Sequence, residues 1–171
     1  DLLGPRPGKP DYLEQTQAWE KGENGTIYAV KSGAAFGDDE NEKKRKTFED
    51  FVRQSNDCVE ALDEGIGRVI AALRETGQLE NTLIVFAADQ GFGMGEHGFR
   101  MKLGPWDATY RSPLIVSMPA LFPQGKACLQ PVHCVDLVST FLATAGIEQP
   151  WEMHGHDLTP LLKNPDIAGA E

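Results

Sequence analysis

Hydrophobic positions between Thr47 and Gly77 recur every three or four residues, which is the period of one face of an α-helix. We therefore expect an amphipathic helix of about eight turns over this stretch. Thr47, with an acid at Asp50 three residues later, resembles a capping box, and Gly77 supplies a stop signal. The apolar positions are Phe48, Phe51, Val52, Val59, Leu62, Ile66, Val69, Ile70 and Leu73.

Two short apolar runs, "NTLIVFAAD" at 81–89 and "SPLIVSMP" at 112–119, predict strands. Both runs are apolar at successive positions, so we expect them to be fully buried. A second helix is expected over about 136–145, with Gly146 as its cap. The order helix, strand, long loop, strand, helix indicates an α/β class in which helices pack on a sheet.

The first 46 residues show no sustained period, and only "TIYAV" at 26–30 predicts a short strand. We therefore expect an irregular, loop-rich segment over 1–46, the α/β part over 47–165 and a tail over 166–171. No internal repeat is visible. The sequence thus favours one domain.

Charge and composition exclude several kinds of partner. Sixteen basic against 26 acidic residues give a net charge of −10, which argues against binding to nucleic acid or to an anionic membrane surface. No run approaches the ~20 apolar residues that cross a bilayer, so no membrane span is expected. Cys58, Cys128 and Cys134 lack metal-site spacing and are expected to be buried, with a bridge between Cys128 and Cys134 left open.

The stretch "AADQGFGMGEHGFRMK" at 87–102 carries the candidate chemistry. In open α/β sheets ligands gather beyond the carboxyl ends of strands, where Asp89 and Gln90 offer two hard oxygen donors suited to Ca²⁺ or Mg²⁺. Glycines let the loop turn back, so that Lys102 returns as a point charge able to hold an anion. A turn-forming acid and a solvated lysine remain the alternative interpretation.

Several segments in a fixed order resemble a known family. "NTLIVFAADQGFGMGEHGFRMK", "RSPLIVSMP", "PVHCVDLVSTFLATAGIEQP" and "GHDLTPLL" are similar to the later part of the catalytic domain of type I sulfatases, in the alkaline phosphatase superfamily. "DCVEALDEGIGRVIAALRETGQLENT" is similar to the helix before them. The resemblance runs from about Phe48 to Leu162. It implies an alkaline phosphatase-like sheet with packed helices, of which 47–165 form a partial domain.

The resemblance also implies roles for residues of the loop. Asp89 and Gln90 are expected to be metal ligands, normally for Ca²⁺ with Mg²⁺ second, and Lys102 is expected to contact the sulfate group in catalysis. His97 either shapes the loop as a hydrogen-bonder or contacts the substrate. Arg111 is expected to be a structural ion-pair partner. Three further histidines, His133, His154 and His156, are expected to have structural or polar roles.

Sulfatases of this type use a formylglycine made from Cys or Ser in a C-x-P-S-R motif, whereas the cysteines here lie in "CVEAL", "CLQPV" and "CVDLV". The chain is therefore expected to carry the back half of an active site and to be inactive without the remainder of the parent chain. The resemblance implies a sulfate ester of a small molecule or carbohydrate as substrate, and a periplasmic or secreted location. A phosphodiester or phosphonate hydrolase of the same superfamily, or a non-catalytic scaffold module, remain the alternatives.

Overall fold

The chain divides into two compact units. The first unit consists of Asp1–Gly67 and Gln90–Ser112, and the second of Arg68–Asp89 and Pro113–Glu171. The structure, a computed structural model, describes residues 3, 18–29, 47–102 and 104–166. Val30, the last residue of the predicted "TIYAV" strand, lies outside these ranges. Most of the predicted loop-rich segment over 1–46 and most of the predicted tail over 166–171 also lie outside them.

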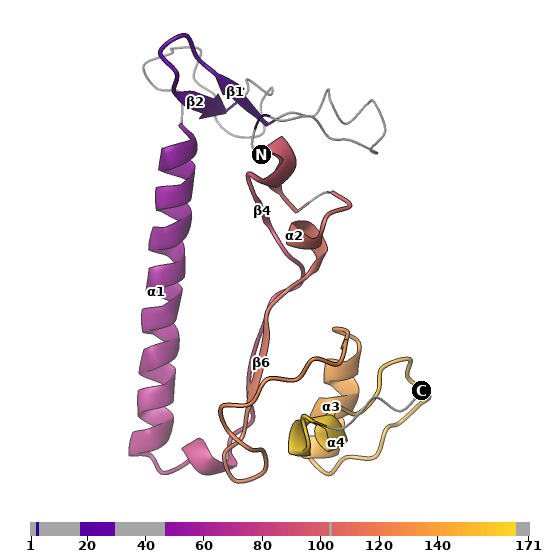
Figure 1. Cartoon of the computed structure of the whole chain (residues 1–171). Helices are drawn as coiled ribbons and strands as arrows, with labels where there is room; N and C mark the ends of the chain where they lie inside the picture. Colours follow the sequence, from indigo (N-terminus) through magenta and orange to yellow (C-terminus); the bar gives the residue numbers. More distant parts are fainter. Residues whose placement is uncertain (1–2, 4–17, 30–46, 103, 167–171) are drawn as a thin grey trace. The chain divides into compact units, whose positions relative to one another are not determined.

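The long helix α1 (Phe48–Glu75) forms where the hydrophobic period predicts it (Figure 1). At its start the Asp50 N–H donates to Thr47 Oγ1 at 3.0 Å, and the Thr47 N–H donates to Asp50 Oδ2 at 3.2 Å. This reciprocal pair is the predicted capping box. At its end Gly77 takes a left-handed φ of 69°, and the Gln78 N–H donates to the Leu73 carbonyl at 2.8 Å. Both ends of α1 are therefore set by local sequence signals.

Loss of the N-terminal cap is expected to loosen the first turn of α1. Thr47→Ala removes the hydroxyl that accepts from Asp50, at a cost of ~1 kcal/mol, which corresponds to a roughly fivefold change in an opening equilibrium. Hydrogen exchange at the Asp50 amide in the full-length protein should accelerate by about that factor. Thr76→Ala, at the opposite end, is the matched control and should leave Asp50 exchange unchanged; equal protection of Asp50 in all three proteins would contradict the cap.

The core of the first unit is aromatic. Strands β1 (Trp19–Lys21) and β2 (Ile27–Ala29) pair antiparallel, which confirms a strand in the predicted "TIYAV" stretch. Trp19 is buried, and its ring centroid lies 5.0 Å from that of Phe48 and 5.4 Å from that of Phe51. The first turn of α1 therefore packs against the hairpin through these three rings.

The two predicted strands pair with each other in the second unit. Strand β3 (Ile84–Ala87) lies antiparallel to β6 (Leu114–Ser117), with Ile84 opposite Ser117 and Ala87 opposite Leu114. The prediction of full burial is wrong, because three β3 residues are half-buried, Ala87 is exposed, and Ile115 is 62% exposed. Apolar residues on both faces are buried only where both faces are covered, and the described part of the chain gives this pair no third strand.

Helices α3 (Asp136–Thr144) and α4 (Thr159–Lys163) follow in the same unit and contact each other. The predicted helix over 136–145 is confirmed, and Gly146 caps it with a left-handed φ of 68°. The residues that α3 buries are polar, namely Asp136, Ser139 and Thr140. The contacts of these buried polar groups decide how the segment before α4 is held.

The three cysteines differ from the prediction that they are buried. Cys58, Cys128 and Cys134 are all free and exposed in the structure, so the prediction of burial is wrong and the optional Cys128–Cys134 bridge is not formed. Every residue of α1, which the structure describes in full, is at least partly exposed, and this includes Cys58. Cys128 and Cys134 lie in an irregular surface segment before α3.

Candidate functional site

The residues predicted for the site lie where β3 ends and in the loop that follows. Asp89 is exposed and Gln90 is half-buried. The two units meet in the sequence at the peptide bond between Asp89 and Gln90. Asp89 therefore belongs to the second unit, and Gln90, His97 and Lys102 belong to the first. The structure therefore brings three of the four predicted residues into one unit, and Asp89 is joined to them as the chain neighbour of Gln90.

A short hairpin returns Lys102 toward the start of the loop. Strand β4 (Gly93–Met94) pairs antiparallel with β5 (Arg100–Met101), and Gly93 is the partner of Met101. Paired Cα atoms in an antiparallel ladder lie roughly 4.5–5.5 Å apart. Lys102 follows Met101 directly, so its backbone comes back beside the residues just after Gln90. The predicted return of the glycine-rich loop is thus found within this unit.

The turn of this hairpin carries unusual backbone angles. Gly95 and Gly98 have φ values of 131° and 70°, and His97 has a left-handed φ of 56°. A side-chain-bearing residue in this region costs of order 1–3 kcal/mol, and such residues gather at functional sites. The Met94 N–H donates to Glu96 Oε2 at 2.7 Å, and Gly98 O accepts from the Ala18 N–H at 2.9 Å.

The imidazole of His97 stacks on the ring of Trp106. Their ring centroids lie 5.0 Å apart at an interplanar angle of 16°. His97 is exposed, whereas Trp106 is only 7% exposed. This stack gives His97 a contact that shapes the loop, whereas the predicted loop-shaping role was that of a hydrogen-bonder, which stays a prediction. Contact between His97 and substrate stays a prediction.

The start of the loop packs closely on the short helix α2 (Asp107–Tyr110). A Cβ added at Gly91 would lie 2.4 Å from the Ala108 carbonyl oxygen and 2.5 Å from that of Arg111, so only glycine fits there. Arg111 Nη1 lies 3.5 Å from Asp107 Oδ2, which confirms the predicted ion-pair role of Arg111. Gly91, the residue after Gln90, therefore lies directly against the backbone of α2 and of the residue that follows it.

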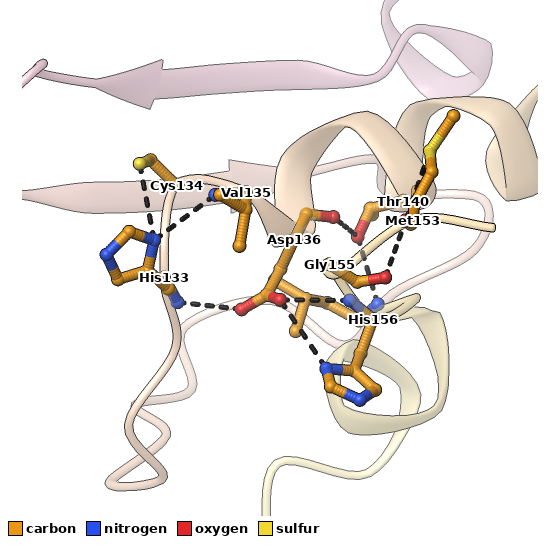
Figure 2. Close-up of polar contacts among 10 residues, drawn as sticks. His133, Cys134, Val135, Asp136, Thr140, Met153, Gly155 and His156 are labelled. Atoms are coloured by element: carbon orange, nitrogen blue, oxygen red, sulfur yellow. Dashed lines mark hydrogen bonds and ion pairs between the residues drawn. The ribbon is translucent and has the colours of Figure 1, made fainter.

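A separate polar cluster in the second unit surrounds Asp136 (Figure 2). Its Oδ2 accepts from the His133 N–H at 2.7 Å, and its Oδ1 accepts from the His156 N–H at 2.9 Å. Thr140 Oγ1 donates to the Asp136 carbonyl at 2.7 Å and accepts from the Leu158 N–H at 2.9 Å. These bonds give the backbone N–H groups of His133 and His156 a structural role, and the roles of the two imidazoles stay predictions. The cluster joins the start of α3 to the segment before α4.

The pKa of Asp136 reflects two opposing effects. Burial alone would raise it, but the N–H groups of His156 and then His133, together with the charges of both imidazoles, bring the pKa below the ordinary value of 3.8. Backbone N–H bonds favour the carboxylate form. Asp136 is therefore ionised at neutral pH.

This lowered pKa predicts how stability responds to acid. A folded-state pKa below the unfolded value gives stabilisation that is present above pH ~4 and lost as the pH falls through the folded pKa. The Tm of the wild-type protein should exceed that of Asp136→Asn near neutral pH, and the gap should shrink below pH 4. Asp166→Asn, an exposed acid of the same unit, should show no such converging gap. A constant gap between wild type and Asp136→Asn down to pH 2 would contradict the ionised carboxylate.

The oxygen donors of the loop fit only part of a calcium site. Asp89 and Gln90 carry carboxylate and amide oxygens of the kind that Ca²⁺ prefers, but Ca²⁺ takes 6–8 oxygen ligands. Among the described residues, no group of three or more His, Cys, Asp or Glu side chains is arranged to hold a metal ion.

In the part of the chain that the structure describes, no helix is long and apolar enough to cross a membrane.

Comparison with known proteins gives consistent matches. The sulfatase family model matches residues 9–147. The N-acetylglucosamine-6-O-sulfatase of Bacteroides thetaiotaomicron is 38% identical over 117 residues, which are 68% of this chain and 21% of that relative. The chain thus spans about a fifth of the length of the curated relatives it matches.

Two of the solved structures that are similar to this chain are informative about its fold. A protein in complex with its substrate D-glucosamine-2-N,6-O-disulfate matches with a TM-score of 0.60 and 40% identity, over 63% of this chain and 22% of that one. A phosphonate monoester hydrolase from Silicibacter pomeroyi matches with a TM-score of 0.58 and 38% identity, over 64% and 21%.

These matches confirm the predicted fold class, because the chain shares part of an alkaline phosphatase-like α/β domain with both solved structures. The order of elements from α1 to α4 in the chain agrees with that class. The family follows from the sequence match over 9–147. The chain belongs to the sulfatase family.

Proposed function

We propose that this chain is part of an enzyme that hydrolyses sulfate esters, and that it supplies one wall of the sulfate pocket. The observation that carries the proposal is the hairpin of β4 and β5, which returns Lys102 beside the residues after Gln90. A carboxamide and an ammonium carried by one folded loop suit a ligand with several negative oxygens. The family membership of the chain supports sulfate as that ligand.

Each loop residue has a distinct proposed role. Lys102 donates hydrogen bonds to sulfate oxygens and stabilises the charge that grows on them in the transition state. Asp89 and Gln90 would hold Ca²⁺, with Mg²⁺ as the second candidate, and such an ion when bound supplies further positive charge to the sulfate. The formylglycine and the remaining metal ligands are proposed to come from the rest of the parent chain, so this chain by itself is expected to be inactive.

The proposed substrate is a sulfated carbohydrate. Support comes from two similar proteins, one named for N-acetylglucosamine 6-O-sulfate and one solved with a glucosamine disulfate substrate. We further propose a periplasmic or secreted location, which the family resemblance implies. Cell fractionation with an antibody against the parent protein tests this, and recovery only in the cytoplasm would contradict it.

Phosphonate or phosphodiester hydrolysis is the second candidate. The phosphonate monoester hydrolase match favours it, since its identity to this chain is close to that of the substrate complex. Both esters place negative oxygens around a tetrahedral centre, so Lys102 would serve either reaction.

Rates on matched substrates separate the two functions. The full-length protein should be assayed with Ca²⁺ on N-acetylglucosamine 6-sulfate, on an aryl sulfate and on the corresponding aryl phosphonate and phosphodiester. We expect the highest kcat/KM on a sulfate ester. A dominant phosphonate or phosphodiester rate would establish the second candidate, and no turnover of any ester would favour a non-catalytic scaffold.

A further inference from the structure

The segment that carries Lys102 is held on both sides by one aromatic ring, that of Trp106. Upstream of Lys102, the Phe99 ring lies 4.9 Å from the Trp106 ring at a tilt of 58°, and the His97 ring stacks at 5.0 Å. Downstream, a Cβ added at Gly104 would lie 2.5 Å from Cε3 and Cζ3 of Trp106. The ring thus contacts side chains three and five residues before Lys102 and lies against the glycine two residues after it.

Trp106 is itself fixed by α2. Thr109 is 3% exposed, and its Oγ1 lies 2.5 Å from the Gly104 carbonyl oxygen and 2.8 Å from that of Trp106. The single hydroxyl hydrogen is therefore shared between the two carbonyls. The Thr109 N–H also donates to the Trp106 carbonyl at 2.9 Å. These bonds tie together the backbone from Gly104 to Thr109, which includes Trp106.

We propose that Trp106 is a positioning residue for Lys102: it clamps the chain on both sides of the lysine and so fixes the point from which the ammonium reaches the sulfate. The inference rests on the proposed function, in which Lys102 touches the substrate. A lysine side chain is flexible and carries about 2 kcal/mol of rotamer entropy. The position of its ammonium group is therefore well defined only when the backbone at its Cα is held in place. A displacement of about 1 Å at a catalytic group can cost on the order of a hundredfold in rate.

The strained backbone of His97 agrees with this role. A left-handed φ of 56° at a histidine persists only when surrounding contacts enforce it, and its stack on Trp106 is such a contact. Removal of the ring would release His97, Phe99 and Gly104 together. Lys102 lies between the last two of these residues and would lose its fixed position.

A double-mutant cycle in the full-length protein tests the proposal, with Trp106→Ala, Lys102→Ala and the pair assayed on the best sulfate ester. Trp106→Ala should lower kcat by roughly 10–100-fold with a smaller change in KM, because the lost contact acts on the transition state. In the Lys102→Ala background the same change should cost less than about twofold. Trp106→Phe keeps a ring for stacking and should retain activity within about threefold of wild type.

A matched control separates positioning from packing. Phe122 is an aromatic side chain of similar burial, 4% exposed, in the other unit, and Phe122→Ala should lower Tm without lowering kcat in this way. Equal kcat losses for Trp106→Ala with and without Lys102 would overturn the inference while leaving the proposed function intact. A Lys102→Ala protein with wild-type kcat would overturn both, since Trp106 would then have no catalytic group to position.

Discussion

Lys102→Ala in the full-length protein is expected to lower kcat for sulfate-ester hydrolysis by about 10²–10³-fold, the range seen when one preorganised donor to a developing negative charge is removed. The hairpin that pairs Gly93 with Met101 brings the lysine back beside the start of the loop. An alanine there keeps the hairpin but removes the ammonium. Steady-state kinetics on the best sulfate ester, with circular dichroism to check folding, measure the effect.

Two further variants isolate the charge and its geometry. Lys102→Arg keeps the charge with a planar head group and should recover only part of the lost rate. Lys126→Ala removes another exposed lysine, in the loop before α3, and should change kcat by less than about twofold. A Lys102→Ala loss no larger than that of Lys126→Ala would show that Lys102 is a solvated surface lysine.

Gly155→Ala is expected to be the most destabilising single-methyl addition in the second unit. A Cβ at this buried position would lie 2.0 Å from the Val135 carbonyl oxygen and 3.0 Å from the Asp136 Cα. Both atoms belong to backbone, which cannot rotate away as a side chain would, so a cost of ~3 kcal/mol is expected. The displaced segment would also strain the bond from the His156 N–H to Asp136 and the bond from Ser139 Oγ to the Gly155 carbonyl.

Gly146→Ala is the matched control for this prediction. Gly146 has a left-handed φ of 68° with open space around its Cα, so alanine there costs only the backbone term of ~1 kcal/mol. Thermal unfolding of the full-length variants should therefore show a larger fall in Tm for Gly155→Ala. A larger fall for Gly146→Ala would mean that the contact between Gly155 and Val135 is not tight in solution.

Features set by neighbouring residues were predictable from the sequence. The two ends of α1 depend on Thr47, Asp50 and Gly77, each of which acts within a turn of its own position. The end of α3 at Gly146 has the same origin. The return of the glycine-rich loop was also predicted from its glycines, of which Gly95 and Gly98 adopt positive φ angles and Gly91 and Gly93 do not.

Features set by distant contacts were not predictable in this way. Asp136 is buried because it accepts N–H groups from His133 and from His156, twenty residues away, and no periodic pattern marks such a pair. Trp106 follows from no periodic pattern either, and only the structure shows its ring against Phe99 and Gly104.

The burial of β3 and of the cysteines was misjudged for a related reason. Apolar character predicts what a residue prefers, whereas burial requires a second surface to cover it. For β3 and for Cys58, the described part of the chain does not supply full cover.

A crystal structure of the full-length protein with Ca²⁺ and a slowly hydrolysed sulfate ester tests the proposed pocket most directly. We expect oxygens of Asp89 and Gln90 within about 2.3–2.6 Å of the ion, and the Lys102 ammonium nitrogen within about 3 Å of a sulfate oxygen. A structure in which the ion and the sulfate bind away from these three side chains would contradict it.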